Sequence, residues 1–135
     1  MYIRMIKRRL LSVAAALVFL FMVSGCKSEE EQLIEYKQIS QKEAKEIMDS
    51  MEEYVILDVR TKEEYDEKHI PGALFIPNEE IQKRAEAELL DKEMTILVYC
   101  RSGNRSKAAS EKLVELGYTN VLEFGGINTW PYETE

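Results

Sequence analysis

The chain has 135 residues and a formal net charge of −7, a length that predicts one folded domain of ordinary size. The surplus of acidic over basic side chains disfavours nucleic acid as a general partner, because the phosphate backbone attracts basic surfaces. Two cysteines and one histidine are too few for the ligand sets of structural zinc sites, and no metal or organic cofactor is expected.

The first 25 residues have the pattern of an export signal. Residues 1–9 hold four basic side chains and no acid, and residues 10–23 are almost wholly apolar. An apolar run of about 14 residues suits a signal peptide and is short for a membrane span. The run ends in Val23-Ser24-Gly25-Cys26, which resembles the lipobox of bacterial lipoproteins. In that family the cysteine receives a diacylglyceryl group and becomes the N-terminus of the mature protein.

The resemblance implies an exported protein that a lipidated Cys26 anchors to the bacterial cell membrane. Two or more acyl chains, such as palmitate, give stable anchoring, whereas one chain binds weakly. Residues 26–34 then form the lipidated N-terminus and an acidic tether, and residues 35–135 form the folded domain. Without residues 1–25 the chain keeps 14 basic and 25 acidic side chains, a net charge of −11. A plain signal peptide or an uncleaved anchor is the alternative.

Lipidation of Cys26 would leave Cys100 as the only thiol of the mature chain. No internal disulfide can then form, although exported proteins usually reach compartments where disulfides persist. A lone exported cysteine is either buried and inert or kept for its reactivity.

The domain sequence alternates helical and strand patterns. Capping boxes at Ser40 and Thr61 predict two helix starts, and apolar runs rich in β-branched residues predict buried strands. Asn78 is expected to cap a third helix and Ser106 a fourth, with Gly117 at the left-handed position after its end. The expected strands are 54–59, 73–76, 95–99 and 120–124, the last ended by Gly125-Gly126, and the expected later helices are 79–90 and 106–116.

This alternation predicts an α/β domain in three layers, with a central parallel sheet flanked by helices. Ligands bind beyond the carboxyl ends of the strands in such sheets. Three segments are therefore expected to converge at one edge, namely 58–60, 100–105 and 123–126. A domain of this size is expected to be a monomer.

Cys100 stands between a predicted strand and a predicted helix, followed by Arg101, Ser102, Gly103, Asn104, Arg105 and Ser106. Gly103 and Asn104 best tolerate the positive φ that so sharp a turn requires. Such a turn directs backbone N–H groups inward, and the following helix adds the positive end of its dipole. These donors and the two guanidinium groups favour the thiolate, which is the nucleophilic form. A buried structural cysteine is the alternative, but this polar loop makes a poor core and a good anion cradle.

Two segments, "LDVRTKEEYDEKHIPGALFIP" and "ILVYCRSGNRSKAASEKLVELGYTNVLEFGGINTW", closely resemble a single-domain rhodanese. The resemblance implies a rhodanese-like fold and sulfur transfer from a small anionic donor such as thiosulfate to a thiol or cyanide. Cys100 matches the family's catalytic cysteine, which carries the sulfur as a persulfide. The family's six-residue loop matches residues 100–105, whose amides would stabilise the persulfide and whose Arg101 and Arg105 would suit an anionic donor.

Residues outside the loop are given smaller roles. Asp58 and Arg60 match family positions and are expected to support the loop, Asp58 by pairing and Arg60 by pairing or by reaching the substrate. His69, the only histidine, is expected to pack in a turn and to make a backbone hydrogen bond rather than to act as a base. Trp130 is expected in the core.

Two rival functions stay open. Phosphatases and arsenate reductases on related folds place five residues between cysteine and arginine, whereas four lie between Cys100 and Arg105. The other rival is a rhodanese-like module that binds a partner or carries sulfur without catalysis on the membrane surface.

Overall fold

The structure is a computed structural model that describes residues 33–135. The predicted signal peptide, the predicted lipidation site Cys26 and most of the predicted acidic tether lie outside the described residues. Within residues 33–135 no helix has both the length and the apolar character to cross a membrane.

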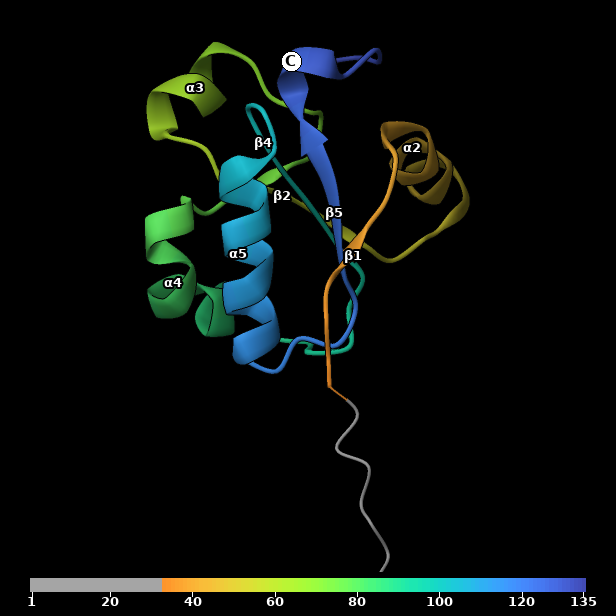
Figure 1. Cartoon of the computed structure of the whole chain (residues 1–135). Coiled ribbons are helices and arrows are strands. Elements are labelled where there is room, and N and C mark those ends of the chain that lie inside the picture. The colour runs from red at the N-terminus through yellow and green to blue at the C-terminus, as the bar shows by residue number, and fades with distance from the viewer. Residues whose placement is uncertain (1–32) are drawn as a thin grey trace, which may run out of the picture. The chain divides into compact units, whose positions relative to one another are not determined.

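The core of the domain is a single sheet of five parallel strands in the order β1-β5-β4-β2-β3. The helices lie on both faces of this sheet, so the predicted three-layer α/β fold is confirmed. Helices α4 and α5 cover one face, while α2 lies on the other (Figure 1). The strands are β1 (Lys37–Gln38), β2 (Val55–Asp58), β3 (Leu74–Phe75), β4 (Ile96–Cys100) and β5 (Val121–Gly126), and the helices are α2 (Gln41–Ser50), α3 (Lys62–Glu67), α4 (Ile81–Glu88) and α5 (Asn104–Glu115), with 3₁₀ turns η1 (Asn78–Glu80) and η2 (Ile127–Thr129).

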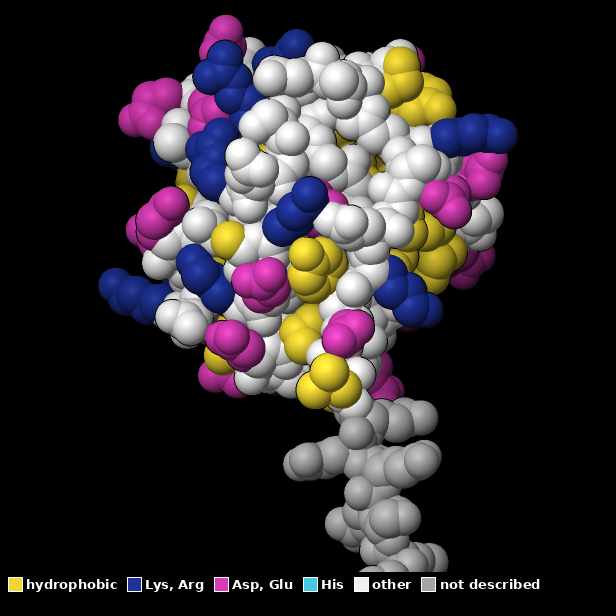
Figure 2. Space-filling model, in the orientation of Figure 1, with side chains coloured by type: hydrophobic (Ala, Val, Ile, Leu, Met, Phe, Trp, Pro, Cys, Tyr) yellow, Lys and Arg dark blue, Asp and Glu magenta, His cyan; other side chains and the backbone are white. Residues whose placement is uncertain are grey.

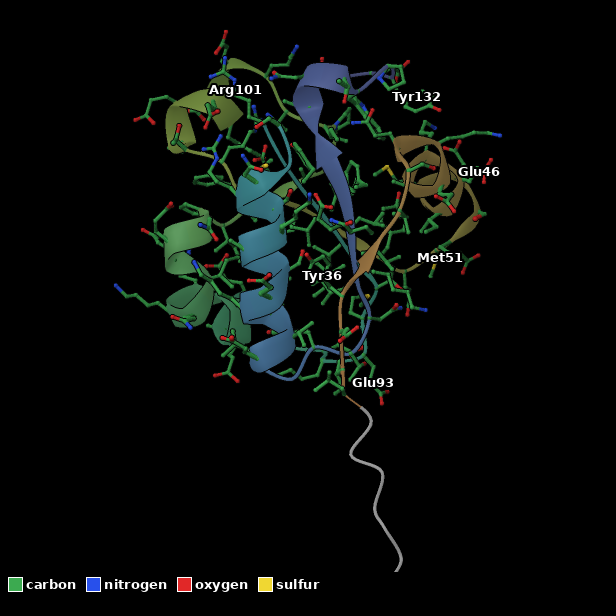
Figure 3. All side chains as sticks on the ribbon, in the orientation of Figure 1. Tyr36, Glu46, Met51, Glu93, Arg101 and Tyr132 are labelled. Carbon is green, nitrogen blue, oxygen red and sulfur yellow. The ribbon has the colours of Figure 1, made fainter. Side chains whose placement is uncertain are left out.

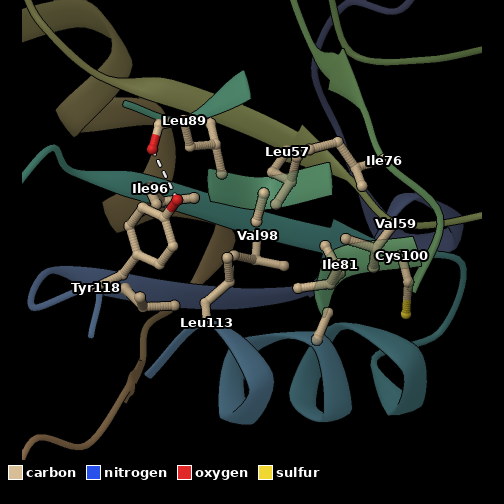
Figure 4. Packing of buried hydrophobic residues seen from close by; sticks show 13 residues of the cluster. Leu57, Val59, Ile76, Ile81, Leu89, Ile96, Val98, Cys100, Leu113 and Tyr118 are labelled. Atoms are coloured by element: carbon tan, nitrogen blue, oxygen red, sulfur yellow. Dashed lines mark hydrogen bonds between the residues drawn. The ribbon is translucent and has the colours of Figure 1, made fainter. Parts of the chain in front are cut away.

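The central strand β4 is buried along its whole length. Its side chains alternate between the two faces, so that Val98 and Cys100 join the core beneath α4 and α5 while Leu97 and Tyr99 join the core beneath α2. A strand covered on both sides needs apolar side chains at successive positions, which explains the unbroken apolar run in the sequence. In Figure 4 Cys100 lies at the end of the core beneath α4 and α5, with its sulfur directed toward the start of α5.

The capping boxes of α2 and α3 are confirmed, because Ser40 and Thr61 each exchange hydrogen bonds with the glutamate three residues later. The left-handed glycine after α5 is confirmed as well, since Gly117 has φ of +92°.

The predicted N-cap at Ser106 was wrong. Helix α5 begins at Asn104 with Gly103 as its N-cap, and Gly103 alone of the loop has a positive φ, +108°. Glycine enters the helix from this conformation without the steric cost that a Cβ would bring. Ser106 therefore lies inside the first turn, where its buried hydroxyl is available for contacts beneath the loop.

Two other boundaries also differ from the prediction. The chain makes the 3₁₀ turn η1 before α4, and Asn78 accepts hydrogen bonds from Lys112 Nζ rather than capping a long helix. Strand β5 runs through Gly125 to Gly126, which pairs with Cys100 beyond an irregularity in the β4–β5 ladder. The two glycines thus bring β5 up to the loop instead of ending it.

Candidate active site

The carboxyl ends of β2, β4 and β5 meet at one edge of the sheet, as the sequence predicted. Tyr99 at the end of β4 donates to Asp58 of β2 over 2.6 Å, and Ser106 behind the loop lies 2.6 Å from Glu123 of β5. In Figure 3 this edge carries the labelled Arg101, together with α3 and the start of α5.

The loop after Cys100 is held against the end of β5. A Cβ at Gly126 would lie 2.1 Å from the Arg101 carbonyl oxygen and 2.6 Å from Ser102 Cα, which no real side chain tolerates. The backbone N–H of Asn128 donates to the same Arg101 oxygen over 3.2 Å. This close approach turns the loop back over the strand end, where the Gly103 N–H points at Cys100 Sγ with an N···S distance of 3.0 Å.

The environment of Cys100 favours the thiolate. Burial opposes ionisation, because the residue is only 1% exposed. Hydrogen bonds from the Ser106 hydroxyl and from the backbone N–H groups of Ser106, Gly103 and Ser102 outweigh burial and hold the pKa of the Cys100 thiol below its usual value. The thiolate form is therefore favoured at the base of the loop, and the burial of Cys100 restricts access to small reagents.

Glu123 is the residue of this site whose role the sequence did not reveal. It is 2% exposed, and its Oε1 atom lies 2.6 Å from Ser106 Oγ and 2.8 Å from the backbone nitrogen of Gly125. Ser106 Oγ lies in turn 3.4 Å from Cys100 Sγ. The alternation of β5 was the available signal, because Glu123 is two residues from Val121, which lies in the core beneath α5.

Asp58, Arg60 and Tyr99 form a second buried cluster beside the loop. Arg60 donates to Asp58 from Nε and from a terminal nitrogen, the latter over 2.6 Å, and also to the Lys68 carbonyl. The charge of Asp58 raises the pKa of Arg60 against the opposing effect of burial, and burial followed by the same charge raises the pKa of Tyr99. Arg60 therefore pairs with an acid here, which is one of the two roles expected for it.

The two loop arginines differ in position. Arg105 donates to both oxygens of Glu64 over 2.7 and 2.9 Å, and these hydrogen bonds lower the pKa of Glu64 to about 2. Arg101 is exposed. The expectation that both guanidinium groups would face the sulfur is thus replaced by one arginine neutralised by Glu64 and one directed to solvent.

The structure also shows where the other residues considered in the sequence analysis lie. The side chains of Ser102 and Asn104 are exposed, and Ser102 acts on the sulfur through its backbone N–H. His69 stacks on Tyr65 with ring centroids 3.9 Å apart, and its Nδ1 lies 2.8 Å from the Tyr65 carbonyl oxygen. Trp130 is half-buried against the core beneath α2. Within residues 33–135 no three His, Cys, Asp or Glu side chains gather in a way that could hold a metal ion.

Comparison with known proteins places this site in a family. Residues 40–132 match the model of the rhodanese-like domain. The chain is 42% identical over 71 residues to the thiosulfate sulfurtransferase PspE of Escherichia coli, covering 53% of this chain and 68% of that protein. It is 41% identical over 96 residues to the thiosulfate sulfurtransferase GlpE of Coxiella burnetii, covering 70% and 87%. A solved structure, a rhodanese with anions from E. coli, superimposes with a TM-score of 0.58 at 36% identity, over 61% of this chain and 96% of that one.

Proposed function

Because the chain belongs to the family of rhodanese-like domains, we propose that it is a thiosulfate-type sulfurtransferase that carries a sulfane sulfur on Cys100. One observation supports this most directly. The Cys100 thiol has a pKa below its usual value because the loop's N–H groups and the Ser106 hydroxyl point at the sulfur.

The reaction proceeds in two displacements at sulfur. The Cys100 thiolate attacks the outer sulfur of thiosulfate, a new S–S bond forms, and sulfite leaves with the electron pair of the broken bond. A thiolate or cyanide then attacks the terminal sulfur of the Cys100 persulfide, and the Cys100 thiolate is released. Both steps begin and end with an anionic sulfur on the enzyme, so the same backbone donors stabilise the resting thiolate and the persulfide.

The loop geometry supports sulfur transfer over phosphate chemistry. Only four residues separate Cys100 from Arg105, and the Arg105 guanidinium is occupied by both oxygens of Glu64. A phosphatase would need that arginine to bind the equatorial oxygens of the phosphoryl group. Arg101 is the exposed charge that remains to attract an anionic donor. Basic and acidic side chains are interspersed over the face seen in Figure 2, so the attraction is local rather than due to a broad basic surface.

We further propose that the enzyme is exported and anchored to the bacterial cell membrane through Cys26. The first described residues lead into β1, whose parallel pairing with β5 makes the chain enter the sheet at the edge opposite the Cys100 loop (Figure 1).

Mass spectrometry of the purified chain tests the proposal. After treatment with thiosulfate, the Cys100 peptide should gain the mass of one sulfur atom, and cyanide should remove it with release of thiocyanate. Cys100→Ser, which still holds Cys26, is the matched control and should show neither change. A chain that never takes up sulfur would favour the non-catalytic module, and hydrolysis of an aryl phosphate would favour the phosphatase. For the anchor, metabolic labelling with a palmitate analogue should mark the wild-type chain and not Cys26→Ser.

A further inference from the structure

Beside the Cys100 loop, an ion pair links two helices. Arg105 in the first turn of α5 donates to both carboxylate oxygens of Glu64 in α3, over 2.7 and 2.9 Å. The pair is only partly buried, since the side chains of Arg105 and Glu64 are 31% and 21% exposed. In Figure 1 α3 accordingly lies beside the segment that leads from β4 into α5. The pair is thus open to solvent at the same edge of the sheet as the loop.

Arg105 belongs to the immediate surroundings of the sulfur. The backbone N–H of the next residue, Ser106, points at Cys100 Sγ, and the charge of Arg105 interacts with that sulfur. A guanidinium group with its fork of N–H donors binds the oxygens of anions strongly. Glu64 occupies two of these donors and supplies the opposite charge. The carboxylate therefore decides how much of Arg105 is available to an anion at the sulfur.

Glu64 is held in place independently of Arg105. Its Oε2 atom accepts the backbone N–H of Thr61 over 3.0 Å, and its own N–H donates to the Thr61 hydroxyl, which completes the capping box of α3. The hydrogen bonds from Arg105 lower the pKa of Glu64 to about 2, so the carboxylate is ionised near neutral pH. Because it is fixed to the start of α3, the carboxylate restrains the guanidinium group and does not follow it toward an anion.

The other two arginines at this edge differ in whether a carboxylate holds them. Arg60 has Asp58 as its partner at 2.6 Å. Arg101 is exposed, and none of the ion pairs within residues 33–135 includes it. Glu64 therefore leaves one uncompensated positive charge at the loop, where the sequence places two.

We propose that Glu64 is a positioning residue that sets donor specificity by holding Arg105 in the ion pair. The proposal rests on the proposed function and deepens it. Thiosulfate carries two negative charges, whereas an alkanethiosulfonate presents the same outer sulfur on a sulfonyl group and carries one. While Arg105 is held, the site gains little from the second charge of thiosulfate, so donors of lower charge compete with it. Release of Arg105 would favour the dianion.

Alkylation of Cys100 in the purified full chain tests the proposal without relying on sulfur transfer. Iodoacetate is an anion and iodoacetamide is neutral, and both react with the thiolate, so the ratio of their rates does not depend on the thiol pKa. Mass spectrometry of the Cys100 peptide separates this reaction from any at Cys26. Glu64→Gln keeps an acceptor for the Thr61 N–H and removes the charge. It should raise the iodoacetate-to-iodoacetamide ratio about fivefold, as expected for the release of one partly exposed charge.

Two controls separate this effect from a general change in charge. Glu63→Gln removes an exposed charge of the same helix turn that belongs to no ion pair within residues 33–135, and it should change the ratio by less than about twofold. In the Arg105→Ala background Glu64→Gln should also change the ratio by less than about twofold, because no guanidinium group is left to release. An unchanged ratio in Glu64→Gln, or an equal rise with and without Arg105, would overturn the proposal.

Steady-state kinetics extend the test to sulfur donors. Glu64→Gln should raise kcat/KM for thiosulfate about fivefold relative to that for methanethiosulfonate, mainly through a lower KM for thiosulfate. A chain that shows the expected alkylation ratios but takes up no sulfur from either donor would refute the proposed function alone. A chain that transfers sulfur but keeps the wild-type donor preference in Glu64→Gln would refute the specificity role alone.

Discussion

Two buried clusters lie on opposite sides of the end of β4. One of them contains an ion pair, and the other holds its acidic groups with neutral donors. On the side of Tyr99, the carboxylate of Asp58 accepts from the backbone N–H, Nε and a terminal nitrogen of Arg60 and from the Tyr99 hydroxyl. Each charge in this cluster therefore has its counterpart. The cluster holds β2, β4 and the turn after α3 together.

On the side of Cys100, the thiol and the carboxyl group of Glu123 share only neutral donors, namely the Ser106 hydroxyl and backbone N–H groups. Neither has a guanidinium or ammonium partner among the ion pairs of the described domain. The comparison teaches that the acid beside Tyr99 is paired with a guanidinium group and serves stability, whereas the thiol and the carboxyl group behind the loop are held by neutral donors alone. Substitutions on the two sides should therefore have different effects.

Cys100→Ser should have the largest effect on activity and a small one on stability. Sulfur transfer should fall by at least about 10³-fold, because the oxygen of serine cannot carry a sulfane sulfur. The free energy of unfolding should change by about 1 kcal/mol or less. Thiocyanate formation and urea denaturation measure the two quantities, and residual transfer by this variant would rule out Cys100 as the carrier.

Asp58→Ala should have the opposite profile. It leaves the guanidinium of Arg60 buried without its partner, which costs about 3–5 kcal/mol of unfolding free energy. Tyr99→Phe removes one neutral donor to the same carboxylate and the acceptor of the Ile70 N–H, and should cost about 1–2 kcal/mol. Urea denaturation of both variants tests the difference, and equal losses would contradict the role assigned to the ion pair.

Gly126→Ala should displace the loop and affect the Cys100 side alone. The new methyl group would overlap the backbone of Arg101 and Ser102, so we expect a loss of about 1–3 kcal/mol and at least about a tenfold slower alkylation of Cys100. Gly117→Ala is the matched control, since Gly117 has a positive φ but no atom within 4 Å of an added Cβ. That variant should lose about 1 kcal/mol through strain and keep normal alkylation.

The ion pair of Glu64 and Arg105 predicts a smaller, pH-dependent effect. The folded-state pKa of Glu64 is lowered to about 2, so its contribution to stability is complete above the unfolded pKa of about 4.3 and is lost as the pH falls toward 2. Glu64→Gln should cost about 1–2 kcal/mol at neutral pH and nothing below pH of about 2. Thermal denaturation of both chains across this range measures the difference, and a pH-independent loss would contradict the ion-pair explanation.

The smallest effects are expected from substitutions of the two loop arginines, and the two substitutions should change KM by different amounts. Arg101→Ala should raise KM for thiosulfate by about threefold to tenfold, because an exposed charge near an anionic donor is worth about 1 kcal/mol. Arg105→Ala should change KM less, since Glu64 already neutralises that arginine. Measurement of KM with an anionic and with a neutral sulfur donor tests the charge argument. Equal changes in KM for the two donors would refute it.

The sequence by itself was sufficient for the α/β class, both capping boxes, the three converging segments and Cys100. These features depend on local patterns, because apolar runs, capping residues and turn glycines act within a few positions along the chain. Contacts between distant segments could not be predicted in this way. Gly103, and not Ser106, is the N-cap of α5, and the residues just before it pack against Gly126 of β5.

Only the tertiary structure decided which acid meets which base or hydroxyl. Glu64 and Arg105 are 41 positions apart, and Ser106 and Glu123 are 17 apart. Their pairing depends on strand order and on how α3 and α5 dock, which no local spacing encodes. The residue types therefore determined that a polar loop would follow Cys100 at the end of a buried strand. The packing of the sheet edge determined which loop arginine pairs with Glu64 and which carboxyl group lies behind the sulfur.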